Sequence, residues 1–136
     1  MADLTITAAS VVPASGASVN SGTAGETITA GMALYLKSAD ARYWKAQCDG
    51  TTEESTVAGV AINGASAGQP VSFINAGTVT IGATTVKTTA YMLSAAAGAI
   101  CPQADLVSTN KIVYIGFATD AVGTFQMMLR VSGAVV

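Results

Sequence analysis

The chain has 136 residues and a formal net charge of -2; 51% of its residues are hydrophobic and only 10% are charged. This length predicts one domain that can bury a core, and an apolar chain with so little net charge is not a disordered one. Ala, Gly, Ser and Thr make up 68 residues, so the surface is covered by hydroxyls and backbone amides or by other protein chains.

Residues 1–25 predict an extended N-terminal arm. The segment is uncharged after its third residue and contains no aromatic residue, so it is too poor in large side chains to build a core. Its apolar residues include Leu4 and Ile6, which alternate with threonines, and the pair Val11 and Val12. These four residues are candidates for docking onto another protein by adding a strand to its sheet. The alternative is an edge strand that folds back onto its own domain.

Residues 26–136 predict a single all-β domain, because short apolar or alternating runs are separated by turn-forming residues about every ten positions. The runs lie at 32–37, 42–47, 57–63, 70–75, 78–81, 89–94, 99–101, 111–119 and 124–131. About ten short strands at this spacing favour a small antiparallel β-barrel or sandwich. The alanine-rich segment 90–99 leaves a helix open as an alternative at that point.

The second half of the chain resembles the first at an offset of about 56 residues. Tyr35 is followed by a Ser-Ala turn, as is Tyr91, and Gly59 begins a Gly-x-Ala sequence, as does Gly116. This order predicts two pseudo-repeats, although some similarity by chance is expected in a chain rich in alanine and glycine. The two halves would be residues 24–77 and 76–133. A glycine inside a strand indicates a bulge, a corner or the close approach of another group.

The sequence contains no histidine, which removes Ser/His/Asp and Cys/His catalytic sites and histidine-containing zinc sites. The acidic residues are scattered, and the one adjacent pair, Glu53 and Glu54, lies in a polar loop where it is expected to be solvated. We therefore expect no catalytic residues, no cofactor, no metal site and no enzymatic activity. Cys48 and Cys101 are expected to be free and buried, with a disulfide as the alternative.

Tyr43 and Trp44 form the one aromatic pair and are a possible exposed aromatic site. Neighbouring residues of a strand face opposite sides, so only one of the two rings could stack on a given sugar. A carbohydrate-binding or fibre-type β module of a virion is therefore an alternative function, and the other interpretation is that Trp44 anchors the core. With six scattered basic residues and a sequence pI near 4.7, we expect no nucleic-acid partner.

The order of these motifs resembles that of the decoration (cement) proteins of tailed-phage capsids, over residues 24–133 and the small-residue arm. The segments that carry the resemblance are Ala30-Gly31-Met32-Ala33-Leu34-Tyr35-Leu36, Tyr43-Trp44-Lys45-Ala46, Val57-Ala58-Gly59-Val60-Ala61, Ala67-Gly68-Gln69-Pro70-Val71 and Ala76-Gly77-Thr78-Val79. The resemblance implies an all-β module, commonly a homotrimer at threefold positions, that bridges major capsid protein subunits and stabilises the shell. It transfers no individual functional residue.

The distribution of charge along the chain makes this expectation more specific. Charged residues gather between Lys37 and Glu54, whereas the arm and the segment from Ser55 to Val86 have none beyond Asp3. We expect the charged segment to face solvent on the outer surface of the capsid and the neutral segments to face other protein chains. The start of the chain lacks a secretory signal and no segment is apolar enough to span a membrane, so synthesis in the host cytoplasm is expected. A tail structural protein is a further alternative.

Overall fold

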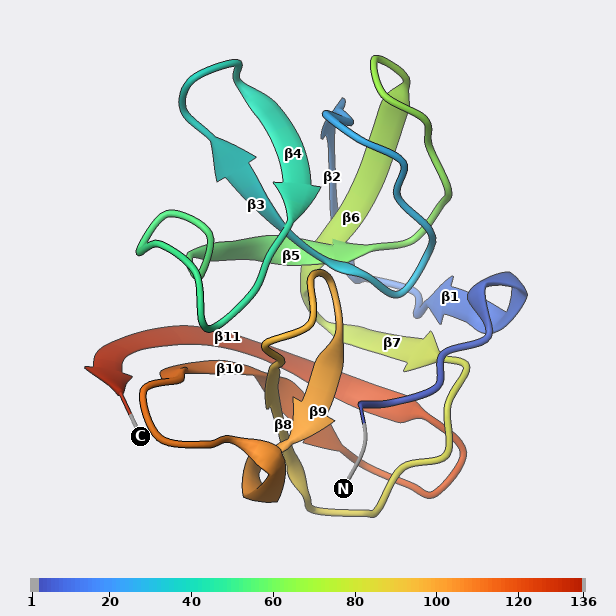
Figure 1. Ribbon diagram of the computed structural model, residues 1–136. Coiled ribbons are helices and arrows are strands. Elements are labelled where there is room, and N and C mark those ends of the chain that lie inside the picture. The colour runs from blue at the N-terminus through green and yellow to red at the C-terminus, as the bar shows by residue number, and fades with distance from the viewer. Residues whose placement is uncertain (1–2, 136) are drawn as a thin grey trace.

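The computed structural model describes residues 3–135 and consists of two stacked antiparallel β-sheets (Figure 1). The strands are β1 (Val11–Pro13), β2 (Ser18–Thr23), β3 (Ala33–Lys37), β4 (Arg42–Lys45), β5 (Val57–Ala61), β6 (Pro70–Ala76), β7 (Thr78–Ile81), β8 (Ala90–Leu93), β9 (Ile100–Pro102), β10 (Lys111–Ala118) and β11 (Thr124–Val135). Two short 3-10 turns, η1 (Ala8–Ser10) and η2 (Gln103–Asp105), complete the secondary structure of the described residues. The all-β prediction is confirmed, in its sandwich-like form. The alanine-rich segment left open as a helix forms β8 and a turn.

The order in the six-stranded sheet is β1-β7-β11-β10-β8-β9, and in the five-stranded sheet it is β2-β6-β5-β3-β4. The main hydrophobic core lies between the sheets and contains Tyr35, Val60, Tyr91 and Phe125. A smaller core forms inside the five-stranded sheet, which curls until Ala24 makes a bridge to Tyr43 at its opposite end. Curling lets a sheet of small side chains enclose apolar groups without a second layer.

The two sheets repeat the same strand arrangement, because β2 to β6 and β7 to β11 each follow the spatial order first, fifth, fourth, second, third. The register also repeats: Leu34 of β3 lies opposite Gly59 of β5, and Tyr91 of β8 lies opposite Gly116 of β10. Tyr91 and Gly116 lie 57 residues after Leu34 and Gly59, respectively, and both strand pairs have a bulge next to the glycine. Pairing registers therefore support the predicted pseudo-repeats.

The repeat differs from the prediction at the tyrosine motif, whereas Gly59 and Gly116 are equivalent as predicted. Tyr91 is equivalent to Leu34 and not to Tyr35, since the offset in these strands is 57 and not 56. One residue of slip places the two tyrosines on opposite faces of their sheets, although their sequence surroundings are alike. The halves that share this topology are residues 18–76 and 78–135, so the first strand of the first half lies inside the segment predicted to be an arm.

The structure also corrects the extended arm, because both of its strands pair within the domain. β1 pairs antiparallel with β7, and β2 pairs antiparallel with β6 along its whole length. Pairing satisfies backbone N–H and C=O groups that a free arm would leave to water, and this needs few large side chains. The segment therefore contributes an edge strand to each sheet, as the alternative interpretation proposed.

Candidate interaction surfaces

Three of the four arm residues predicted to dock onto a partner pack against the chain's own core. Leu4 and Ile6 are half-buried against the main core, and Val11 is buried in it. The backbone N–H of Leu4 donates to the carbonyl oxygen of Ile100 at 2.8 Å, which holds this segment along β9. Only Val12, with 57% of its surface exposed, is free to meet another protein.

The aromatic pair also has partners within the chain. The ring of Tyr43 packs on Phe73 with a centroid distance of 4.7 Å and lies directly over Gly22. The Nε1 of Trp44 donates to the carboxylate of Asp40 at 3.1 Å, and the ammonium group of Lys37 lies 4.4 Å from the centre of the Trp44 ring. Because both rings are already engaged, their geometry does not favour a sugar-stacking platform.

One side of the molecule collects the charged residues. Eight of the fourteen charged residues lie within residues 26–54, in the β3–β4 hairpin and the segments next to it. Several of them have partners nearby: Glu53 accepts a hydrogen bond from the hydroxyl of Ser38 at 2.7 Å, and the ammonium of Lys45 lies 3.7 Å from Glu26. This network gives the hairpin a hydrated surface.

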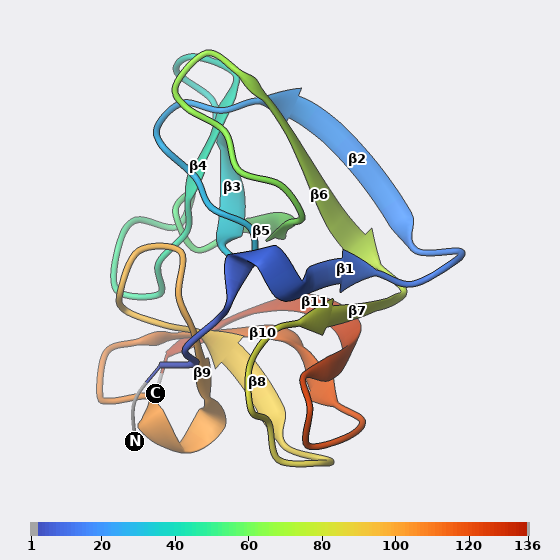
Figure 2. The same ribbon diagram turned by 90° about the vertical axis from the view of Figure 1, so that its right-hand side faces the viewer.

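The other side is formed by four strands that contain no charged residue, namely β1, β2, β6 and β7. Two neutral stretches that are separate in sequence come together there, because β1 pairs with β7 and β2 pairs with β6. Figure 2 shows these strands toward the right of the view and the β3–β4 hairpin toward the left. Val12 and Val19 project from this uncharged side, and the hydroxyls of Ser21 and Ser72 are 3.3 Å apart across β2 and β6. We call it the neutral side.

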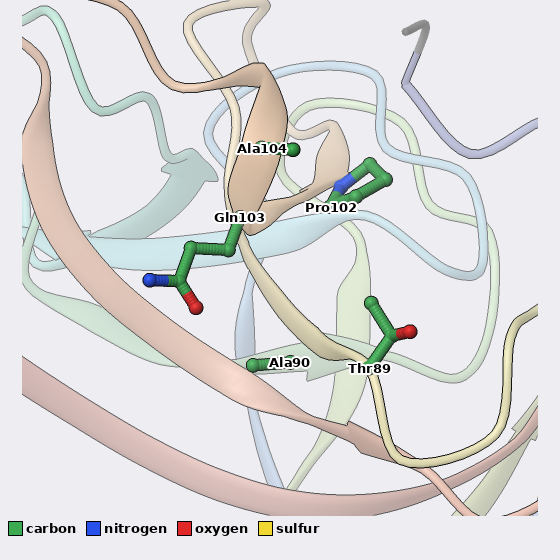
Figure 3. Close-up of a pocket in the computed structure, with 5 residues that line it drawn as sticks. All are labelled: Thr89, Ala90, Pro102, Gln103 and Ala104. Carbon is green, nitrogen blue, oxygen red and sulfur yellow. The ribbon is translucent and has the colours of Figure 1, made fainter.

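The outer face of the six-stranded sheet is a second apolar surface. A shallow pocket next to η2 is lined by Thr89, Ala90, Pro102, Gln103 and Ala104 (Figure 3). A neighbouring pocket shares Gln103 and is lined by Met92, Leu106, Ile112 and Tyr114. Neither pocket is lined by an acidic or basic side chain, so acid–base chemistry and cation binding have no basis there.

Internal symmetry explains why this outer face is apolar. Tyr114 and Phe117 of β10 are half-buried, and their equivalents in β5 are Val57 and Val60, which belong to the main core. In the first repeat this face of the sheet packs against the second repeat. In the second repeat the equivalent face of the sheet is open. The sequence pattern could not distinguish a face that is covered from one that is exposed.

The described residues contain neither a candidate metal centre nor a candidate membrane-spanning helix. No group of three or more Cys, Asp or Glu side chains within residues 3–135 could hold a metal ion, and no described helix is long and apolar enough to cross a membrane. Cys48 and Cys101 are free and buried, as predicted. Burial, with a smaller contribution from the charges of Asp3 and Asp105, raises the pKa of Cys101 to about 12, so its thiol is unreactive at neutral pH.

No protein-family model matches the chain, and the search of curated proteins found no significant relative. What can be said about function therefore depends on the surfaces of the molecule. Sequence analysis identified Val12 as a docking residue, but it did not identify Val19 or the open side of β2. The segment that forms β2, Ser18 to Thr23, contains one large apolar residue and gives almost no strand signal.

Proposed function

We propose that the protein is a decoration protein of a tailed-phage capsid, which binds the assembled head lattice, bridges major capsid protein subunits and stabilises the shell. The observation that carries the proposal is the neutral side, where four uncharged strands from two distant segments lie together and only the end of β2 meets the charged hairpin. A surface without charge loses little hydration when another protein covers it, so it suits a permanent contact. The motif order shared with decoration proteins supports the same function.

Such a protein works by mass action and needs no catalytic group. A subunit that binds only the assembled lattice stabilises that lattice, and the stabilisation grows with the logarithm of the free subunit concentration above the Kd. We further propose that three copies associate, because joining three weak contacts multiplies the strength of attachment. The neutral side would face the capsid subunits or the other copies, and the β3–β4 hairpin would face solvent on the outside of the virion.

Binding to undecorated phage heads tests this function. The purified protein should cosediment with heads in a saturable manner, remain absent from tails, and raise the temperature at which the heads release their DNA. Val12→Lys, which places a charge on the neutral side, should weaken binding at least tenfold, equivalent to about 1.4 kcal/mol. Val107→Lys is the matched control, because Val107 is 63% exposed and lies in the loop between η2 and β10.

The outcomes separate the possible virion roles. Binding to tails and not to heads would contradict the proposal and favour a tail structural protein. Equal loss of binding in both lysine variants would show that the neutral side is not the contact. Sedimentation equilibrium of the isolated protein tests the trimer: a mass of three chains is expected, and a monomer at all concentrations would overturn that part.

A further inference from the structure

β2 is an edge strand without the usual protection against pairing with another chain. Among the described strands it pairs with β6 alone, and five of its six residues are exposed. Edge strands are commonly blunted by charged residues, by proline or by a covering segment. β2 has no charge and no proline, and its single irregularity is a register shift between Ser18 and Val19.

The other three outer strands of the described sheets each have such protection. β1 ends in Pro13, β9 ends in Pro102, and β9 also accepts the backbone hydrogen bond from Leu4. β4 carries Arg42 and Lys45, and it meets the end of β2, because Ala24, directly after Thr23, bridges to Tyr43. The edge of β2 before Thr23 is thus an exception among the described strands.

The internal repeat indicates what a strand beside β2 would be like. β2 is equivalent to β7, since Asn20 lies opposite Phe73 in one repeat and Val79 lies opposite Phe125 in the other. In the second repeat the outer edge of β7 is occupied by β1, which pairs antiparallel. Among the described residues no strand occupies the position beside β2 that is equivalent to β1, and the chain reaches β4 only at Ala24, after β2 has ended.

The chemistry of the site restricts which kind of segment could pair with β2. In the filled site, Val11 lies opposite Ile81 and Pro13 lies opposite Val79, and the inserted segment is uncharged. In the open site the position of Ile81 is taken by Gly22, where a Cβ atom would lie 2.2 Å from the ring of Tyr43. β2 and β6 carry no charge, and the nearest charged strand, β4, meets the chain at Ala24, beyond the site. A charged segment alongside Asn20–Gly22 would therefore lose hydration without a partner in either strand.

We infer that the free edge of β2 accepts a short, uncharged, extended segment of a capsid subunit as an antiparallel strand alongside Asn20–Gly22. The assignment of the partner to a capsid subunit rests on the proposed function, whereas the open edge and its occupant's chemistry do not. Backbone hydrogen bonds would supply affinity that depends little on sequence, and the neutral surroundings would select against charged segments.

Amide hydrogen exchange on heads tests the strand addition directly. The outward-pointing amides of β2 should exchange rapidly in the free protein and at least about tenfold more slowly on heads, because an added strand accepts their hydrogen bonds. Asn20→Lys should weaken binding to heads at least tenfold, and Leu36→Lys, at a site on β3 that is 48% exposed, is the matched control. Head binding by the wild-type protein without protection of β2 would overturn the inference and leave the proposed function standing.

A second measurement needs no heads. A synthetic peptide with the sequence of residues 8–15, which includes β1, serves as the probe, and a peptide with prolines replacing its two valines serves as the control. NMR titration of the full chain should shift the amide signals of β2 with the first peptide only. The absence of these shifts would overturn the inference that the β2 edge accepts a strand, whether or not the protein binds to heads. Dimers of the isolated protein with a protected β2 would assign the edge to a second copy and overturn the capsid partner.

Discussion

The two repeats have the same topology but use it differently. The five-stranded sheet curls around a small core of its own and also packs its outer face on the second repeat, so its central strand β5 is covered on both faces. The six-stranded sheet contributes one face to the main core and leaves the equivalent outer face open. In contrast, the edge that β1 covers in the second repeat is open in the first. Each repeat therefore has a surface that is covered in the other: the first has an open edge, and the second has an open outer face.

The largest expected effect comes from the equivalent phenylalanines. Phe125 is fully buried between the sheets, and Phe73 is buried in the small core. Both changes to alanine should destabilise the fold by about 3–5 kcal/mol, with Phe125→Ala in the upper part of this range because residues from both sheets surround it. Urea unfolding followed by the fluorescence of Trp44 measures the difference. A larger loss from Phe73→Ala would show that the small core holds the molecule together.

The strand glycines test whether the repeats have the same internal constraint. A Cβ atom on Gly59 would lie 2.6 Å from the carbonyl oxygen of Ile74, and one on Gly116 would lie 2.2 Å from that of Gln126. A backbone atom cannot move aside as the end of a flexible side chain can. Each change to alanine should therefore lower the free energy of unfolding by about 1–3 kcal/mol.

Gly64→Ala is the control for these variants, because its Cβ would make an ordinary contact at 3.5 Å. The same urea measurement should find it within about 0.5 kcal/mol of the wild type. If Gly59→Ala were as harmless as this control while Gly116→Ala were not, the two bulges would differ in rigidity despite their equal registers.

Much of the fold followed from local sequence, and the exceptions have physical causes. Alternation located β6 and β7, where one face is buried and the other is not. It missed β2, since an exposed edge strand has no buried face to impose a pattern. The prediction aligned Gly59 with Gly116 correctly but misaligned the tyrosine motif by one residue, because Tyr35 and Tyr91 have similar neighbours and the bulge that sets their faces leaves no local sequence mark.

The candidate surfaces were predicted less well than the fold. Separation of charged and neutral segments along the chain was visible, but their assembly into two sides depends on β1 meeting β7 and β2 meeting β6, which are long-range pairings. The docking role given to Leu4 and Ile6 did not anticipate that the domain itself would cover them. Apolar character indicates burial, and it does not indicate which protein chain provides the cover.

The smallest difference between the repeats lies in the turns that follow their glycine strands. The side-chain oxygen of Asn63 accepts a hydrogen bond from the backbone N–H of Ser72 at 2.6 Å. Asp120, 57 residues later, accepts the equivalent bond from Thr124 at 3.0 Å and another from the N–H of Val122 at 2.9 Å. The two turns thus share a geometry that an amide or a carboxylate can hold.

Only the carboxylate makes that geometry sensitive to pH. Hydrogen bonds from Thr124, through its side chain and then its backbone, and from the backbone of Val122 lower the pKa of Asp120. Since the folded pKa lies below the unfolded value, the stabilisation is present above that unfolded value, about 4, and is lost as pH falls through the lowered pKa. Asp120→Asn should therefore keep the turn, as Asn63 does, and remove this part of the acid sensitivity. Thermal melts at pH 7 and pH 3 should show a smaller difference for Asp120→Asn than for the wild type. An unchanged difference would mean that the carboxylate gains nothing from these bonds in its charged form.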